Sequence, residues 1–133
     1  MDRRQFLTLT GATLAVATPA MAEVVNYTPG LVQQRLQAGE TLFLEFGTKW
    51  CSTCAAQRRT LTSLRDANPN YEQKITFVTV DYDKYGRSEL ATSLRIPRRS
   101  TLVVLKGDKE LGRIVAGTRE NEIKNLMDVA LNA

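Results

Sequence analysis

The stretch LFLEFGTKWCSTC, residues 42–54, joins an apolar run directly to the only two cysteines in the chain. The run at 42–46 is almost entirely apolar, which is typical of a strand buried on both faces of a sheet. Cys51 and Cys54 follow on the expected turn into a helix, with two residues between them. Dithiol–disulfide exchange needs this arrangement, because one thiolate attacks a partner's disulfide and the second thiol resolves the mixed disulfide.

On both sides of this stretch, apolar residues alternate or recur at helical spacing, and they predict further strands and helices. The strands are expected at residues 23–27, 41–46, 75–80, 101–105 and 110–116. The helices are expected at residues 29–38, 51–67, 86–95 and 120–131, the first of them capped by Thr28 with Pro29 at its first position. This order predicts an α/β fold with parallel strands and helical crossovers, followed by a hairpin and a covering helix.

The bulk composition describes one soluble domain of 133 residues, with 43% apolar and 24% charged side chains. The net charge of +4 is modest, and no basic stripe is interleaved with aromatic residues, so the sequence does not favour nucleic-acid binding. The chain has no histidine, which removes the commonest general base and metal ligand. We therefore expect neither a cofactor nor a dedicated metal centre.

Residues 1–22 are predicted to be a cleaved export signal rather than part of the fold. Arg3 and Arg4 precede an apolar stretch at 6–17, and the small residues at 19–22 form a cleavage site, with the cut after Ala22. The paired arginines resemble a twin-arginine signal, and an ordinary secretory signal is the alternative. Export would place the domain at 23–133 in the periplasm, where disulfides persist. A purely structural disulfide is less favoured, because so small a ring adds little stability.

These motifs make the chain similar to the thioredoxin family over nearly all of residues 23–133. The order of elements matches, and the strand at 42–46 followed by Trp50-Cys51-x-x-Cys54 resembles the family's strand and active-site turn. The segment RSTLVVLK, residues 99–106, resembles its substrate-binding turn and fourth strand, and Gly117 falls where the family has a glycine after the fifth strand. The resemblance implies a thioredoxin fold, a central mixed β-sheet flanked by helices.

The resemblance also implies a role for each matching position. Cys51 would be the exposed nucleophile and Cys54 the buried resolving thiol. Glu45 stands where the family often has a buried acid beneath the second cysteine, and Trp50 would shield one side of the site and contact the partner. The residues expected to bind the substrate are Trp50, Ser52, Thr53, Arg99, Ser100 and Thr101.

The chain departs from the family's pattern at three positions. Ser100 stands where the family has a cis-proline beside the disulfide, if the strand sets the register, whereas Pro97 takes that role only through an insertion. The spacing of the strand and the glycine favours Ser100. Arg59 stands near the family's helix-kinking proline, and Thr79 stands where cytosolic thioredoxins keep a lysine near the buried acid.

The residues at the site suggest its chemistry. A helix N-terminus should lower the pKa of Cys51, to which Ser52 and Thr53 either add hydrogen bonds or only cap the helix. Glu45, in an apolar strand, should have a raised pKa and act as the base for Cys54, unless it reaches solvent at the strand end. Ser100 has an N–H that proline lacks, and we expect it to loosen partner specificity or to permit metal or iron–sulfur binding.

The sequence therefore favours a periplasmic thiol–disulfide oxidoreductase that acts as a monomer on protein thiols and disulfides of the envelope. The Ser-Thr dipeptide between the cysteines matches neither the Gly-Pro of reducing thioredoxins nor the Pro-His of strong oxidants. Without a histidine there, a reductase or isomerase role is favoured. A reductase would draw electrons from a membrane thiol transporter and pass them to cytochrome c apoproteins or oxidised envelope enzymes. The alternatives are a metal-binding module, with the cysteines of two copies bridging a metal, and a scaffold that binds a partner without turnover.

Overall fold

The computed structural model describes residues 24–133, so the predicted export signal at 1–22 lies outside the described residues. Within these residues, a five-stranded sheet has the order β1-β3-β2-β4-β5. The strands are β1 (Val25–Asn26), β2 (Thr41–Gly47), β3 (Thr76–Asp81), β4 (Thr101–Lys106) and β5 (Lys109–Val115). β1, β3 and β2 run parallel, whereas β4 is antiparallel to both β2 and β5. The mixed sheet confirms the predicted α/β architecture.

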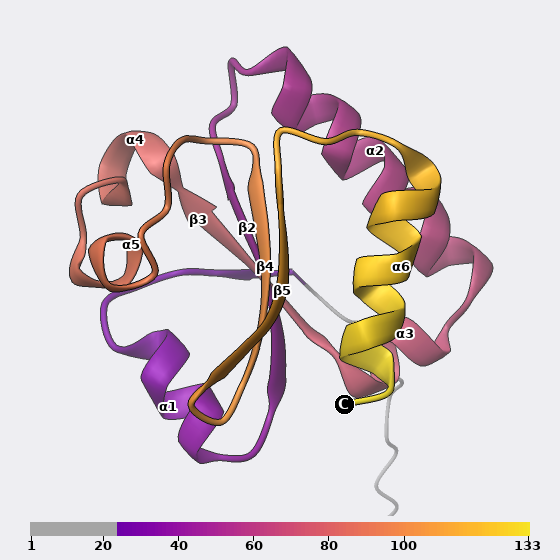
Figure 1. Ribbon diagram of the computed structural model, residues 1–133, viewed down its shortest axis with the longest axis horizontal. Helices are drawn as coiled ribbons and strands as arrows, with labels where there is room; N and C mark the ends of the chain where they lie inside the picture. Colours follow the sequence, from indigo (N-terminus) through magenta and orange to yellow (C-terminus); the bar gives the residue numbers. More distant parts are fainter. Residues whose placement is uncertain (1–23) are drawn as a thin grey trace, which may run out of the picture.

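Helices cover both faces of this sheet (Figure 1). One face carries α1 (Leu31–Gln37), α4 (Tyr82–Tyr85) and α5 (Glu89–Ser93), and the other carries α2 (Ser52–Ala67), α3 (Asn70–Lys74) and α6 (Glu120–Leu131). In the part of the chain that the structure describes, every helix is too short or too polar to span a bilayer.

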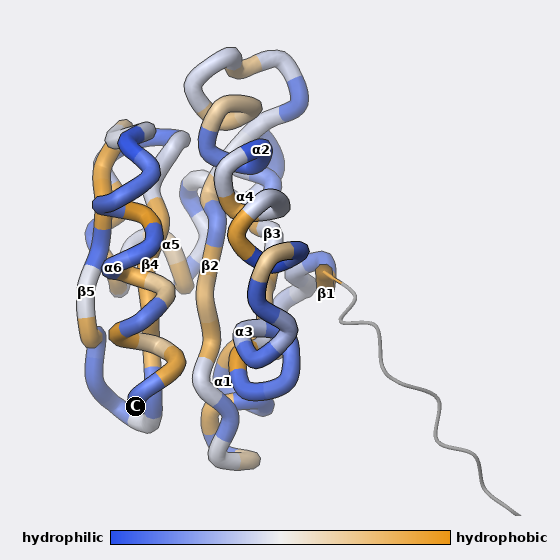
Figure 2. Tube along the Cα trace, turned by 90° about the vertical axis from the view of Figure 1, so that its right-hand side faces the viewer, coloured by the Kyte–Doolittle hydropathy of each residue, from blue (hydrophilic) through white to orange (hydrophobic). Residues whose placement is uncertain are grey.

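The central strand β2 is buried along its whole length, which confirms the prediction from its apolar run. Alternate side chains enter two separate cores, because successive residues of a strand point to opposite faces. Phe43 packs in the core beneath α2, α3 and α6, whereas Leu42 and Leu44 pack in the core beneath α1 and α5. Figure 2 looks onto the sheet and shows β2 as a largely hydrophobic tube between β3 and β4. Glu45 lies two residues beyond Phe43 and therefore faces α2.

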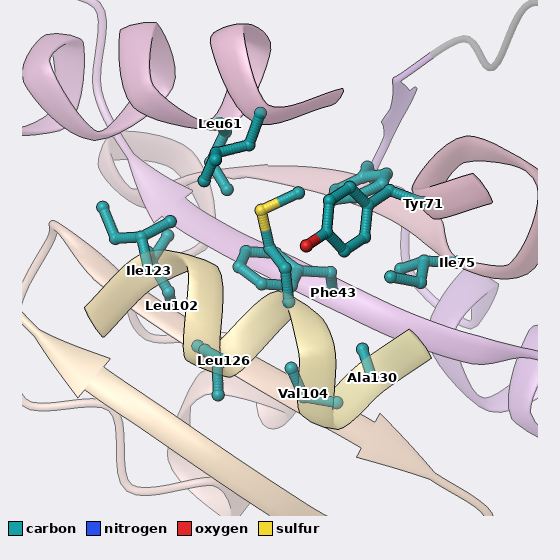
Figure 3. Close-up of a cluster of buried hydrophobic side chains, with 12 residues drawn as sticks. Phe43, Leu61, Tyr71, Ile75, Leu102, Val104, Ile123, Leu126 and Ala130 are labelled. Carbon is teal, nitrogen blue, oxygen red and sulfur yellow. The ribbon is translucent and has the colours of Figure 1, made fainter. Parts of the chain in front are cut away.

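The core beneath α2, α3 and α6 joins elements that are far apart in the sequence. Figure 3 shows Leu61 from α2, Tyr71 from α3 and Ile123 from α6 pointing into one cluster around Phe43. Each of these side chains is at most 5% exposed. Burial of this apolar surface is the main force that holds α2, the helix with both cysteines near its start, against the sheet.

The structure corrects the predicted start of α1. The helix begins at Leu31 rather than Pro29, and its N-cap is Gly30, at φ 91°, without a side-chain hydrogen bond. The N–H of Leu31 donates to the carbonyl oxygen of Thr28 at 3.0 Å, so Thr28 belongs to a preceding turn and does not cap the helix. Glycine permits this left-handed turn at little steric cost.

The predicted helix at 86–95 is too long, because only α5, at Glu89–Ser93, forms within it, and an unpredicted short helix, α4, precedes it at Tyr82–Tyr85. Each has its own N-cap: the Asp81 carboxylate accepts the Asp83 N–H at 3.0 Å, and the Ser88 hydroxyl accepts the Ala91 N–H at 3.2 Å. Caps of this kind begin new helices and interrupt a continuous one. The short helix α3 was not predicted either, since Asn-Pro-Asn at 68–70 indicated only the end of α2.

Candidate active site

Cys51 is the N-cap residue of α2 and follows the carboxyl end of β2 after a short connection. Its backbone is extended, and its sulfur accepts the backbone N–H of Cys54 at 3.2 Å. The predicted location at a helix N-terminus is therefore correct. Figure 1 shows that the β2–α2 connection lies at the same end of the molecule as the turn from β5 into α6. Residues from several loops consequently surround the two cysteines.

Both cysteines are free thiols, and both are buried. Cys54 is 0% exposed, as expected for the resolving position, but Cys51 is only 5% exposed. The expectation of an exposed Cys51 is therefore wrong for this state. The physical reason is that the segment before β4 folds back over the cysteine pair and places Ser100 against both sulfurs.

The pKa of Cys51 falls from 9.0 to about 6. Burial by itself raises this pKa, but hydrogen bonds from the Cys54 side chain, the Ser100 hydroxyl, the Cys54 N–H and Arg99 outweigh it in total. A group that donates a hydrogen bond to a thiolate favours the charged form. At neutral pH the Cys51 thiolate therefore outnumbers the thiol by roughly ten to one. Ser52 and Thr53 are absent from this set of groups; Ser52 points to solvent and Thr53 is half-buried.

Ser100, and not Pro97, lies beside the cysteine pair. Its Oγ is 3.2 Å from the Cys51 sulfur and 3.1 Å from the Cys54 sulfur. Its backbone has φ 66°, in the left-handed region, and its N–H donates to the carbonyl oxygen of Phe46 on β2 at 2.7 Å. The strand spacing thus gave the right register. Thr101, the next residue, uses its hydroxyl within the loop, donating to the Arg98 carbonyl oxygen at 2.7 Å.

Glu45 is 7% exposed, so the alternative that it reaches solvent is wrong. Burial raises the pKa of its carboxyl, and Arg58, whose Nη1 lies 3.3 Å from Glu45 Oε2, opposes that rise. Thr79 pairs with Glu45 across β2 and β3 and contributes a hydrogen bond that also lowers the pKa. Glu45, Arg58 and Thr79 line one cavity of about 270 Å³.

Trp50 and Arg99 form a stacked pair next to the cysteines. The Arg99 guanidinium carbon lies 4.4 Å from the centre of the Trp50 ring, a cation–π contact. The indole N–H donates to the Asp83 carboxylate at 2.9 Å, and Trp50 remains 62% exposed. The ring is thus fixed from two sides and still faces solvent, as expected for a side chain that contacts a partner. The role of Asp83 was not predicted from the sequence.

Two α2 residues were also missed: Gln57 and Arg58. Gln57 is 0% exposed, and its side-chain NH₂ donates to the carbonyl oxygens of Ser100 at 3.0 Å and Gly117 at 2.9 Å. Arg58 pairs with Glu45, its Nη1 lying 3.3 Å from Glu45 Oε2. The sequence held a signal for both residues, because positions three and four after Cys54 lie on the helix face that carries Cys54.

Comparison with known protein families gives one decisive match: the family model described as Thioredoxin covers residues 23–129. The chain belongs to the thioredoxin family. Its fold is the thioredoxin fold, as the sequence predicted, and a thioredoxin domain with a Cys-x-x-Cys pair is a thiol–disulfide oxidoreductase. Among curated proteins, none matches the chain.

Solved thioredoxin-family structures share the fold at low sequence identity. Trxlp from Edwardsiella tarda EIB202 has a TM-score of 0.67 at 23% identity, covering 78% of this chain and 98% of its own. The germline-specific thioredoxin Deadhead from Drosophila melanogaster has a TM-score of 0.62 at 26% identity, covering 81% and 97%. Mitochondrial thioredoxin 3 from Saccharomyces cerevisiae has a TM-score of 0.62 at 23% identity, covering 79% and 94%.

Proposed function

We propose that this thioredoxin-family protein is an exported, periplasmic disulfide reductase, with Cys51 as the nucleophile and Cys54 as the resolving thiol. The observation that carries the proposal is the Cys51 sulfur at the N-terminus of α2, with a pKa of about 6 and the buried Cys54 one helical turn further on. A thiolate that forms below neutral pH attacks disulfides readily, and a second thiol held nearby releases the product.

The exchange takes two steps. The Cys51 thiolate attacks a partner disulfide, so that its S–S bond breaks, a mixed disulfide with Cys51 forms, and the first partner sulfur leaves as a thiolate. Cys54 then loses its proton and attacks the Cys51 sulfur, which releases the second partner sulfur and forms the Cys51–Cys54 disulfide. The partner gains two electrons and the cysteine pair loses two. The released thiolates take up protons from water.

Glu45 is proposed as the base that accepts the Cys54 proton. Its carboxyl is buried on the face of β2 that α2 covers, and a β-carbon added at Gly47, two residues further along β2, would lie 3.2 Å from the Cys54 sulfur. That same β-carbon would lie 3.6 Å from Arg58 Nη1, so the guanidinium that holds Glu45 also lies close to Cys54. Desolvation brings the pKa of Glu45 closer to neutrality, which suits proton acceptance.

The pKa of Cys51 supports a reducing direction. Thioredoxin has a corresponding pKa of about 7 and the strongest periplasmic oxidant about 3.5, because a stabilised thiolate favours the reduced form of the enzyme. At about 6, Cys51 is nearer to thioredoxin. The test is the equilibrium redox potential of the purified protein in glutathione and dithiothreitol buffers. A redox potential of about −270 mV supports the reductase, whereas a redox potential of about −120 to −180 mV overturns it in favour of an oxidant or isomerase.

The proposed location and partners follow from residues 1–22 and from the direction of electron flow. A periplasmic reductase needs a membrane thiol transporter as its electron donor, and cytochrome c apoproteins or oxidised envelope enzymes are the proposed acceptors. Substitution of Arg3 and Arg4 by lysine should block export through the twin-arginine route. Cell fractionation would then find the unprocessed chain in the cytoplasm, and continued processing would indicate the ordinary secretory route.

The metal-binding alternative has little support within one copy of the chain. Among residues 24–133, no three side chains of histidine, cysteine, aspartate or glutamate are placed to hold one metal ion. Two thiolates supply half of a tetrahedral zinc site, so a metal would have to bridge the cysteine pairs of two copies.

A further inference from the structure

Ser100 is fixed rigidly between three elements of the fold. Its side chain is 0% exposed. Its N–H donates to the Phe46 carbonyl oxygen on β2 at 2.7 Å. Its own carbonyl oxygen accepts from the Ala116 N–H at 2.8 Å and from the Gln57 amide at 3.0 Å. With every backbone polar group occupied, the hydroxyl is the only part of Ser100 that is free to change its partner.

That hydroxyl contacts both reacting sulfurs at nearly equal distances, 3.2 Å to Cys51 and 3.1 Å to Cys54. A serine hydroxyl has one hydrogen to donate and two lone pairs to accept with. It therefore donates to one sulfur at a time, and rotation about its C–O bond selects which one. In the free dithiol, the Cys51 thiolate accepts hydrogen bonds from both the Ser100 hydroxyl and the Cys54 side chain.

The backbone at Ser100 has a conformation that is costly for this residue. A non-glycine residue at φ 66° is strained, and Ala116, whose N–H bonds to the Ser100 carbonyl oxygen, also has φ 66°. Strained residues that gather at one site point to a functional requirement. Proline does not fit here, because its ring fixes φ near −65° and it lacks the N–H that bonds to Phe46. The strained backbone at Ser100 thus accompanies a hydroxyl at the position where the family has a proline.

We propose that the Ser100 hydroxyl is a catalytic hydrogen-bond donor shared by both cysteines, which turns from the Cys51 sulfur to the Cys54 sulfur as negative charge moves between them. The proposal rests on the exchange reaction described above and adds a group to it. Ser100 thereby takes part in each chemical step, a role that the sequence did not suggest.

The electron and proton balance of the exchange is unchanged by this role. In the first step, Cys51 loses its charge on forming the mixed disulfide, and the hydrogen bond from the Ser100 hydroxyl to the Cys51 sulfur breaks. The hydroxyl then turns to Cys54 and stabilises the thiolate that forms as the Cys54 proton passes to Glu45. When Cys54 attacks Cys51, the S–S bond to the partner breaks and its sulfur leaves as a thiolate. Ser100 keeps its own proton throughout.

The experiment compares Ser100→Ala and Ser100→Gly with Ser93→Ala, a control whose hydroxyl bonds only to the Leu90 carbonyl oxygen at 3.0 Å on α5. The pKa of Cys51 is measured from the pH dependence of its alkylation rate. An aromatic disulfide that releases a coloured thiolate separates the two steps, because the first release reports attack and the second reports resolution. Trp50, the only tryptophan in the chain, offers an independent fluorescence signal beside Cys51.

Both Ser100 variants should raise the pKa of Cys51 by about one unit and slow resolution about tenfold, since a hydrogen bond to a charged group has this strength. The reduced form should lose stability by the same tenfold factor, which lowers the redox potential by about 30 mV. Ser93→Ala should change none of these values.

Agreement between alanine and glycine is the critical result. Glycine adopts the left-handed backbone without strain, whereas alanine keeps the strain that serine has, so an effect of the backbone differs between the two variants and a purely structural role of Ser100 predicts that glycine behaves like the wild type. That result, or an unchanged pKa in both variants, overturns the proposal. A wild-type protein that fails to reduce any disulfide overturns the proposed function instead, and the measured pKa values distinguish these two failures.

Discussion

At the level of single residues, the sulfur of Cys51 is governed by polar neighbours that outweigh its burial. A buried thiol without such neighbours has a raised pKa and is inert. Here the Cys54 N–H, the Ser100 hydroxyl and Arg99 all favour the thiolate. The Cys54 N–H and the Cys54 side chain, which also lowers the pKa, belong to the Cys-x-x-Cys motif, whereas Ser100 and Arg99 lie outside it, so the acidity of Cys51 does not come from the motif alone.

The alkylation rate of Cys51 should therefore follow a titration with a midpoint at a pH of about 6. Because the thiolate is the reactive form, the rate should be constant above this pH and fall about tenfold for each unit below it. The measurement uses iodoacetamide with mass spectrometry to identify the modified residue. The Cys51→Ser variant gives the background of Cys54, and a midpoint near 8 to 9 would contradict the low pKa.

Glu45→Gln should slow resolution of the mixed disulfide by about tenfold or more while attack by Cys51 stays within about twofold, because a general base acts only on Cys54. The two releases of an aromatic disulfide separate these steps. The matched control is Glu40→Gln, which removes a carboxylate paired with Arg35 at 3.2 Å, away from the cysteines. Equal resolution rates for wild type and Glu45→Gln would exclude Glu45 as the base.

At the level of elements, α2 combines structural and chemical tasks on one face. Cys54, Gln57 and Leu61 are all buried and recur at three- and four-residue spacing, so the same helical face packs into the core and borders the cysteines. Gln57 connects this helix to the loop before β4 and to the loop after β5. Gln57 holds Ser100 in place by donating to the Ser100 carbonyl oxygen, so Gln57 is a positioning residue.

Gln57→Leu should lower the free energy of unfolding by about 1–3 kcal/mol, because two buried hydrogen bonds are lost and the Gly117 carbonyl oxygen loses a donor. The loss is moderated because the Gln57 side-chain oxygen is itself buried without a partner. Urea unfolding measures the change. Gln33→Leu on the exposed face of α1 should shift stability by less than about 0.5 kcal/mol. A stable Gln57→Leu protein with an unchanged pKa of Cys51 would contradict the positioning role.

At the level of the whole molecule, polar contacts between distant segments close the edge of the core beneath α2, α3 and α6. The Tyr71 hydroxyl on α3 donates to the Asp128 carboxylate on α6 at 2.5 Å, and Lys124 binds the other carboxylate oxygen at 3.0 Å. Tyr71 is only 1% exposed, and its ring packs in the core shown in Figure 3. This bond closes α3 and α6 over the same face of the sheet.

The Tyr71–Asp128 bond should make stability depend on pH. The Tyr71 hydroxyl is the main cause of the lowered pKa of Asp128, so its stabilisation is present above the unfolded pKa of about 3.8 and is lost as the pH falls through the lower folded value. Tyr71→Phe should cost about 1–2 kcal/mol at neutral pH and less in acid. Urea unfolding at several pH values tests this, with Tyr85→Phe as the control. A difference that does not change with pH would contradict the role of Asp128.

Much of the fold follows from the sequence because its signals are local. The apolar run of β2, the alternation in β3 and the helical spacing in α6 each depend on neighbours within one element. The errors occurred where single residues decided the helix boundaries: Gly30 at the start of α1, and Asp81 and Ser88 at two separate caps. These residues act through a backbone conformation or a single hydrogen bond, which residue type alone does not specify.

By itself, the sequence determined the mixed α/β fold, the dithiol at a helix start and the residue that stands beside it. Only the tertiary structure decided how that site works. Ser100 lies 49 and 46 residues from the cysteines that it contacts, and Gln57 reaches carbonyl groups 43 and 60 residues away. Such contacts arise because the sheet order places β2 between β3 and β4, so the ends of distant segments meet above one cysteine pair. A sequence pattern encodes which surface of an element is buried, but the partner that each polar group finds there depends on how the elements assemble.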